Sequence, residues 1–96
     1  MPWSWSSTAE ATIANFAWAF SLKNLGKGYY EKGRWNDAIR EFERIVAMRP
    51  EDDGAHQNLA RSYFNLSRDY GREGNIEEEK RLLVRAIEAD PSLSPA

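Results

Sequence analysis

Large, small and aromatic residues recur along the chain at a helical spacing. One set of three is followed by a matching set 34 residues later: Leu25, Gly26 and Tyr29, then Leu59, Ala60 and Tyr63. Residues three or four positions apart share one face of an α-helix. No stretch of useful length alternates between apolar and polar residues with a period of two, so strands are not expected. The pattern predicts an all-α chain.

The first predicted helix is long. Ser7 to Glu10 has the spacing of a capping box, which starts the helix near Thr8. No glycine or proline interrupts the following stretch before Gly26. We expect the helix to run unbroken to about Lys32, with a break near Ser21 as the alternative.

Three more helices are predicted from the residues that commonly begin and end helices. The second helix begins at Asn36 and Asp37 and precedes Pro50; the third begins at Asp52 or Asp53 and ends at Gly74; the fourth begins at Asn75 and closes at Asp90-Pro91. Short turns join the first helix to the second and the third to the fourth. The chain is therefore expected to form two antiparallel helical hairpins.

The segment around Gly26 resembles a tetratricopeptide repeat. That family has Leu-Gly-x-x-Tyr on its first helix, a glycine before the turn, and Ala-x-x-x-Phe with a terminal proline around its second helix. The matching residues are Leu25, Gly26, Tyr29, Gly33, Trp35, Ala38, Phe42 and Pro50. Gly26 and Ala38 are small where two antiparallel helices approach closely, and larger residues are expected to fill the space around them. These larger residues are Leu25, Tyr29, Phe42 and Ile45.

A second repeat is present with an insertion. Its downstream half recurs after 41 residues, seven more than the leading half, which lengthens the leading helix by about two turns. Glu79 stands where Ala38 stands in the first repeat, so either the second pair of helices splays or Glu79 pairs with Arg68 or Arg72. We expect one domain over 1–96, with a Trp-rich extension at 1–18, one repeat at 19–52 and another at 53–93.

The composition limits which ligands and which kinds of catalysis are expected for this chain. Thirteen Lys and Arg against 15 Asp and Glu give a net charge of −2, which does not favour nucleic acid or an anionic membrane surface. With no cysteine and His56 as the only histidine, we expect no enzyme activity, no metal site and no cofactor. The lack of cysteine fits a reducing compartment, and we expect a cytoplasmic protein. The apolar stretch Ala11 to Leu22 is too short and too polar to cross a membrane.

The resemblance implies a binding groove lined by the leading helices, at positions that the packing residues do not use. The residues at those positions are Phe20, Lys23, Asn24, Lys27 and Tyr30 in the first repeat, and Gln57, Asn58, Arg61, Phe64 and Asn65 in the second. Lys23, Lys27 and Arg61 resemble the family's carboxylate-holding grooves, so the partner is expected to be a protein or peptide, with an acidic segment as one candidate. The alternative is that these are ordinary solvated polar positions.

The amino-terminal segment is rich in large apolar residues. Five of them form a candidate interface: Trp3, Trp5, Ile13, Phe16 and Trp18. Either Ile13 and Trp18 pack on the lengthened second repeat, or the segment contacts another copy or a larger assembly, including a membrane-bound one. The first hypothesis for function is a self-associating protein-interaction scaffold. The second is a small assembly subunit that packs through this segment.

Overall fold

The computed structural model describes the backbone of residues 2–93 and the side chains of residues 9–93. In that range the elements are α1 (Pro2–Glu31), α2 (Trp35–Met48), α3 (Asp53–Arg72), α4 (Ile76–Ala89) and the 3₁₀ helix η1 (Pro91–Leu93). No strand occurs in the described part of the chain. The predicted all-α fold with lengthened leading helices is confirmed, since α1 has 30 residues and α3 has 20, against 14 in α2 and in α4.

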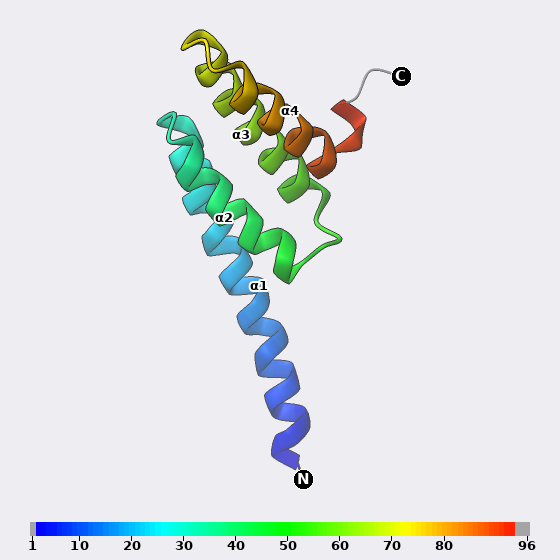
Figure 1. The fold of residues 1–96 in the computed structure, drawn as a ribbon. Coiled ribbons are helices and arrows are strands. Elements are labelled where there is room, and N and C mark those ends of the chain that lie inside the picture. The colour runs from blue at the N-terminus through cyan, green and yellow to red at the C-terminus, as the bar shows by residue number, and fades with distance from the viewer. Residues whose placement is uncertain (1, 94–96) are drawn as a thin grey trace.

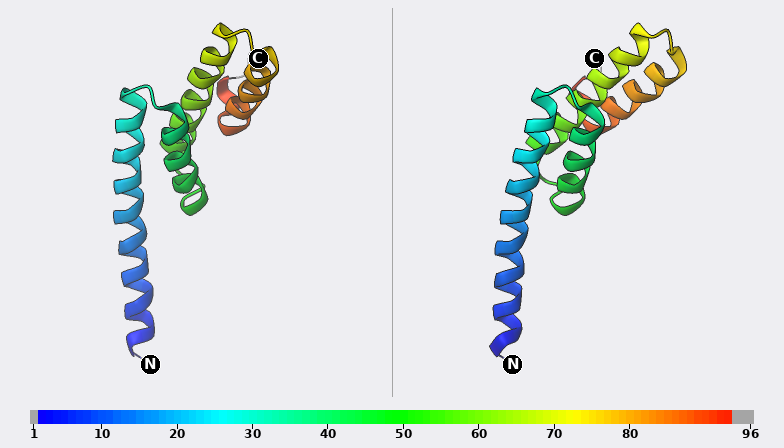
Figure 2. Two further views of the ribbon diagram at one scale, coloured as in Figure 1. Left: turned by 60° about the vertical axis from the view of Figure 1, so that its left-hand side comes forward. Right: turned by 90° about the vertical axis from the view of Figure 1, so that its left-hand side faces the viewer.

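The helices form two hairpins that pack side by side. α1 packs on α2, α2 on α3, and α3 on α4. Figures 1 and 2 show that the amino-terminal half of α1 projects past the end of α2, away from α3 and α4. The molecule is therefore elongated, with extents of 60 × 30 × 17 Å.

The ends of the helices follow local rules. Gly33 and Gly74 end the leading helices with φ of 74° and 82°, a conformation that glycine adopts without strain. The Asp52 carboxylate accepts a hydrogen bond of 3.1 Å from the backbone N–H of Ala55, and the Asn75 side chain accepts one of 3.3 Å from that of Glu78. The predicted starts of α3 and α4 are thereby confirmed.

Two predicted helix starts are wrong. α1 begins at Pro2 and not near Thr8, because proline suits the first helical turn, where its missing N–H is not needed. α2 begins at Trp35, and the N-cap residue Arg34 makes no side-chain capping bond. α1 runs unbroken through Ser21, so the alternative of a break there is excluded.

One apolar core joins the first three helices. Its buried members come from α1, α2 and α3: Leu22, Ala38, Ile39, Phe42, Ile45, Ala55 and Leu59. Phe42 and Ile45 are 1% and 0% exposed, so these two residues of α2 lie at the centre. The second hairpin is therefore fixed to the first through α2.

α1 and α2 approach closely at Gly26. A Cβ atom placed on Gly26 would lie 2.8 Å from Cε1 of Phe42, which is closer than real Cβ contacts. The nearest neighbour of Gly26 is thus Phe42, and not the small residue Ala38 that was expected. The prediction that Leu25 fills this space is wrong: Leu25 is 46% exposed, and Leu22, 4% exposed, lies in the core instead. Leu25 lies on a face of α1 that none of the described helices covers.

Glu79 is accommodated in a way that neither sequence-based alternative described. A Cβ on Gly71 would lie 2.7 Å from Cδ of Glu79, so the missing side chain of Gly71 makes room for the carboxylate. Arg72 pairs instead with Asp69, at 4.0 Å. In the second hairpin, the small residue at the close contact is therefore Gly71 on α3. In the first hairpin, the position equivalent to Glu79 is itself small, since it is Ala38 on α2.

Gly26→Ala is expected to destabilise the fold by about 1–3 kcal/mol, because the added methyl group would overlap the ring of Phe42. This loss exceeds the helix-propensity gain of about 1 kcal/mol that alanine brings. The free energy of unfolding in urea measures the effect.

Gly28→Ala is the matched control on the same helix. No atom lies within 4 Å of a Cβ placed there, so this variant is expected to match the parent or to exceed it by up to about 1 kcal/mol. Equal stabilities for the two variants would show that α1 and α2 do not meet closely at Gly26.

Candidate functional site

A cavity of about 410 Å³ lies between α3 and α4 and reaches Tyr30 of α1. We call it the α3–α4 cavity. Four of the predicted groove residues line it: Tyr30, Arg61, Phe64 and Asn65. Five lining residues were not predicted: Arg68, Leu83, Ala86, Ile87 and Leu93. Arg68 lies on the same helical face as Arg61 and Phe64, so extending the spacing by one turn would have found it.

A hydrogen bond connects the two leading helices beside the cavity. Nδ2 of Asn65 donates to the hydroxyl of Tyr30 at 3.0 Å and to the backbone carbonyl of Arg61 at 2.8 Å. The Tyr30 ring also meets the ring of Trp35 edge-on, with centroids 5.0 Å apart. Tyr30 is thus held on both sides, and the relative position of α1 and α3 is fixed at this point.

The three predicted cationic residues do not share one role. Lys27 and Arg61 are exposed and precede Tyr30 and Asn65 by about one helical turn, so both pairs face the same side. Lys23 instead forms an ion pair with Asp52, with Nζ 3.2 Å from Oδ2. The cations that remain at this surface are Lys27, Arg61 and the unpredicted Arg68.

The other predicted groove residues do not line the α3–α4 cavity. Phe20 is 67% exposed on α1, Asn24 and Gln57 are exposed, and Asn58 is half-buried. Gln57 lines a different cavity, of about 470 Å³, which also contains Asp53 and Glu88. Two regions therefore replace the single predicted groove: the α3–α4 cavity and an open stripe along α1.

Asp52 links the two hairpins. Its carboxylate caps α3 through the N–H of Ala55 and pairs with Lys23 of α1. Partial burial raises the pKa of this carboxyl, but the hydrogen bond from Ala55 and the charge of Lys23 outweigh that effect. The pKa of Asp52 therefore lies below its usual value, and the ionised form favours the folded state.

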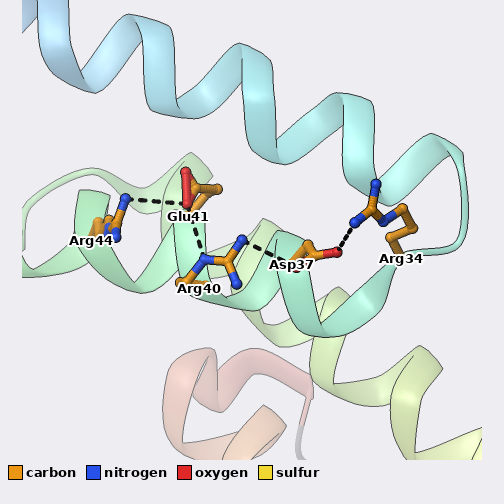
Figure 3. A network of polar contacts seen from close by, with 5 residues as sticks. All are labelled: Arg34, Asp37, Arg40, Glu41 and Arg44. Carbon is orange, nitrogen blue, oxygen red and sulfur yellow. Dashed lines mark hydrogen bonds and ion pairs between the residues drawn. The ribbon is translucent and has the colours of Figure 1, made fainter.

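A network of ion pairs runs along α2 from its N-cap residue Arg34 (Figure 3). Arg34 and Arg40 lie 2.7 Å and 3.1 Å from Asp37, and Arg40 and Arg44 lie 3.5 Å and 3.4 Å from Oε1 of Glu41. Glu41 is 2% exposed. Because each arginine here already has a carboxylate partner, this network is less suited to an acidic ligand than the surface around Arg61.

The described apolar residues of the amino-terminal interface are exposed. Ile13, Phe16 and Trp18 are 68%, 57% and 55% exposed, and only Phe16 has a cationic neighbour, with the Arg49 guanidinium 4.2 Å above its ring. The alternative in which Ile13 and Trp18 pack on the second repeat is therefore wrong. The side chains of Trp3 and Trp5 lie outside the described residues.

The described residues offer neither a metal site nor a membrane span. Among them, no group of three or more His, Asp or Glu side chains is arranged to hold a metal ion. No helix in this part of the chain is both long and apolar enough to cross a bilayer.

Comparison with protein families matches residues 15–92 to the family model of the tetratricopeptide repeat. The chain belongs to the tetratricopeptide repeat family. Tetratricopeptide repeats form a non-catalytic scaffold and generally mediate protein–protein interactions. The fold and the exposed leading-helix residues of this tetratricopeptide protein agree with that general role.

Similar proteins are much longer than this chain. Protein O-mannosyl-transferase TMTC3 of Mus musculus is 28% identical over 89 residues, which cover 88% of this chain and 10% of that protein. The Homo sapiens protein of the same name has the same identity and coverage. The chain thus spans about a tenth of the length of these relatives. No solved structure matches.

Acid is expected to weaken the connection between the hairpins through Asp52. Because the folded-state pKa is lowered, its contribution is fully present above the unfolded pKa of about 3.9 and is lost as pH falls through the folded-state value. Asp52→Asn keeps a capping side chain but removes the charge, so its unfolding free energy should vary less with pH below about 4.

Asp52→Ala removes the cap as well. At pH 7 it should be less stable than Asp52→Asn by about 1 kcal/mol. Urea unfolding of the parent and both variants at pH 3 and pH 7 tests both statements. Identical pH dependence in the parent and in Asp52→Asn would contradict the role of the ion pair.

Proposed function

We propose that this chain is a non-enzymatic protein-interaction scaffold that holds a segment of a partner protein against α1 and α3. The observation that supports this proposal is the α3–α4 cavity, which combines an apolar wall with Arg61 and Arg68 at its polar side. Its position beside the Asn65–Tyr30 hydrogen bond means that both leading helices present it in a fixed geometry. A preformed surface of this kind suits binding, because little order is lost when the partner arrives.

The charges support an acidic, partly apolar partner segment. Among residues 9–93, no ion pair engages Lys27, Arg61 or Arg68. A carboxylate on the partner would gain charge-assisted hydrogen bonds at about 1.5–3 kcal/mol each. Two or three such bonds, less the cost of ordering the segment, correspond to an affinity around the micromolar range. Apolar partner side chains would contact Leu83 and Ile87, which line the same cavity.

The proposal includes no catalytic step, cofactor or nucleic acid. His56, the only histidine, contacts the carbonyl of Pro50 at 2.7 Å through Nε2, which is a structural contact near the start of α3. The transferase named among the relatives is a far longer protein, and its activity is not carried over to this chain. A cytoplasmic location stays part of the proposal.

A second candidate function is a small assembly subunit of a larger complex, including one associated with a membrane only indirectly. The observation that favours it is the projecting half of α1, where Ile13 and Trp18 are more than half exposed. Exposed apolar residues that project together from a small fold commonly mark a protein interface. Self-association as a homo-oligomer belongs to the first proposal, the interaction scaffold.

The double variant Lys27→Glu and Arg61→Glu is expected to abolish binding of acidic carboxyl-terminal peptides, because it replaces attraction with repulsion at the proposed site. Raising the salt concentration should weaken binding by the parent. Fluorescence titration of a peptide library measures both effects.

The control variant carries Lys32→Glu and Lys80→Glu. It makes the same change in net charge at exposed positions outside the cavity lining. It should bind the peptides with an affinity within a factor of about three of the parent. Equal losses in the two double variants, or no binding by the parent, would remove the groove proposal.

Removing residues 1–7 together with Trp18→Ser tests the second candidate. If the amino-terminal segment is an interface, this change should lower the oligomeric mass or release the chain from its complex. Because the core does not include Trp18, unfolding midpoints should change little. A loss of helical circular dichroism greater than the removed residues account for, with no change in mass before unfolding, would instead place these residues in the monomer's own fold.

A further inference from the structure

The contact of α3 with the first hairpin shows how a hairpin of this protein receives a leading helix. α3 presents Ala55, Leu59 and Ser62, which are 0%, 6% and 0% exposed. Ala55 and Leu59 belong to the same core cluster as Phe42 and Ile45 of α2, and Val46 packs against this cluster. We call Phe42, Ile45 and Val46 the receiving residues.

α1 carries the counterpart of the α3 face, and nothing in the described chain covers it. Ser21, Leu25 and Gly28 lie 34 residues before Ala55, Leu59 and Ser62. Their spacing of four and three residues places them on one face of α1. Ser21 and Leu25 are exposed and Gly28 is half-buried. The repeat thus preserves the shape of a docking face that is buried in one copy of the repeat and uncovered in the other.

The second hairpin carries the counterpart of the receiving residues. Leu83, Ala86 and Ile87 lie 41 residues after Phe42, Ile45 and Val46, and all three line the α3–α4 cavity. Leu83 is half-buried and Ile87 is 39% exposed, whereas Ala86 is 1% exposed and forms the floor of the cavity. The cavity therefore occupies, in the second hairpin, the place at which the first hairpin holds α3.

We propose that α1 of a second copy of this chain lies in the α3–α4 cavity and packs Ser21, Leu25 and Gly28 against Leu83 and Ile87. The inference rests on the proposed self-association and identifies the two surfaces that produce it. The existing α2–α3 contact is the template for both surfaces. The α1 face keeps the leucine of the α3 face between two small residues. Leu25 takes the place that Leu59 has within the molecule.

Charge supports the same register. Asn65 bonds to Tyr30 at the α1–α3 contact. In the proposed contact, each residue is replaced by its equivalent in the other repeat, 34 positions away. Glu31 of the incoming α1 takes the place of Asn65, and Phe64 of the cavity lining takes the place of Tyr30. Arg61 and Arg68 lie about one helical turn to either side of Phe64. The docked helix would therefore bring a carboxylate toward two arginines that have no ion-pair partner among the described residues.

The α1 face and the α3–α4 cavity are different surfaces. A pair of copies therefore leaves one α1 face free at one end and one cavity free at the other. Such a head-to-tail arrangement does not close by itself and grows with concentration. Sedimentation velocity of the parent over a wide concentration range should therefore show a mass that rises beyond that of a dimer.

Two single variants separate the surfaces. Leu25→Glu places a charge on the docking face, and Ile87→Glu places one in the cavity. Each variant alone should remain monomeric at concentrations where the parent associates. An equimolar mixture should form a dimer and stop there, because the cavity of Leu25→Glu and the α1 face of Ile87→Glu are both intact and form one contact.

Val84→Glu is the matched control, since Val84 is an apolar residue of α4 that is 56% exposed and does not line the α3–α4 cavity. It should associate like the parent. Ile13→Glu, on the projecting half of α1, tests the amino-terminal segment separately. Circular dichroism checks that every variant keeps its helices, and Leu25→Ala and Ile87→Ala serve where a charged variant does not fold.

Three results would overturn the proposal. A parent that stays monomeric would remove both self-association and the two surfaces. Loss of association in Leu25→Glu but not in Ile87→Glu would indicate symmetric pairing of two α1 helices. Loss of association only in Ile13→Glu would leave self-association in place and move it to the amino-terminal segment.

Discussion

The dominant constraint in this structure is that a two-helix hairpin cannot cover all the apolar faces of its own helices. α2 satisfies the constraint once, because Phe42 and Ile45 are shared with α1 on one side and α3 on the other. The close approach at Gly26 allows Phe42 to lie between the helices. Apolar faces remain uncovered at the two outer sides of the row of helices, where Leu25 on α1 and Ile87 on α4 are exposed. The scaffold proposal and the proposed self-association rest on what those outer sides can bind.

Much of the fold follows from local sequence signals. Gly33 and Gly74 end the leading helices, and Asp52 and Asn75 cap the helices that the sequence predicted. The fate of Leu25 could not be predicted in the same way, because the repeat pattern assigns it a packing role without stating whether a preceding helix is present. The position of Glu79 depended on Gly71, a residue of α3 that lies opposite it in space and eight positions away in sequence.

The binding surface was predicted only in part. Leading-helix spacing found Tyr30, Arg61, Phe64 and Asn65, because helical periodicity alone decides which residues share a face. It missed Leu83 and Ile87, which stand at core positions of the repeat and line a cavity because no further helix covers them in the described part of the chain. It also missed the pairing of Lys23 with Asp52, since the carboxylate belongs to the connection between the hairpins.

The central claim is that the uncovered face of α1 and the α3–α4 cavity are two halves of one contact. Because the chain has no cysteine, a nitroxide can be attached at Lys32→Cys, beside the docking face, and mixed with an unlabelled ¹⁵N-enriched copy. Relaxation enhancement in the NMR spectrum of the enriched copy then reports where the labelled α1 lies. We expect broadening of amides in α4, centred on its first three turns. Broadening centred on α1, or none at concentrations where the protein associates, would contradict it.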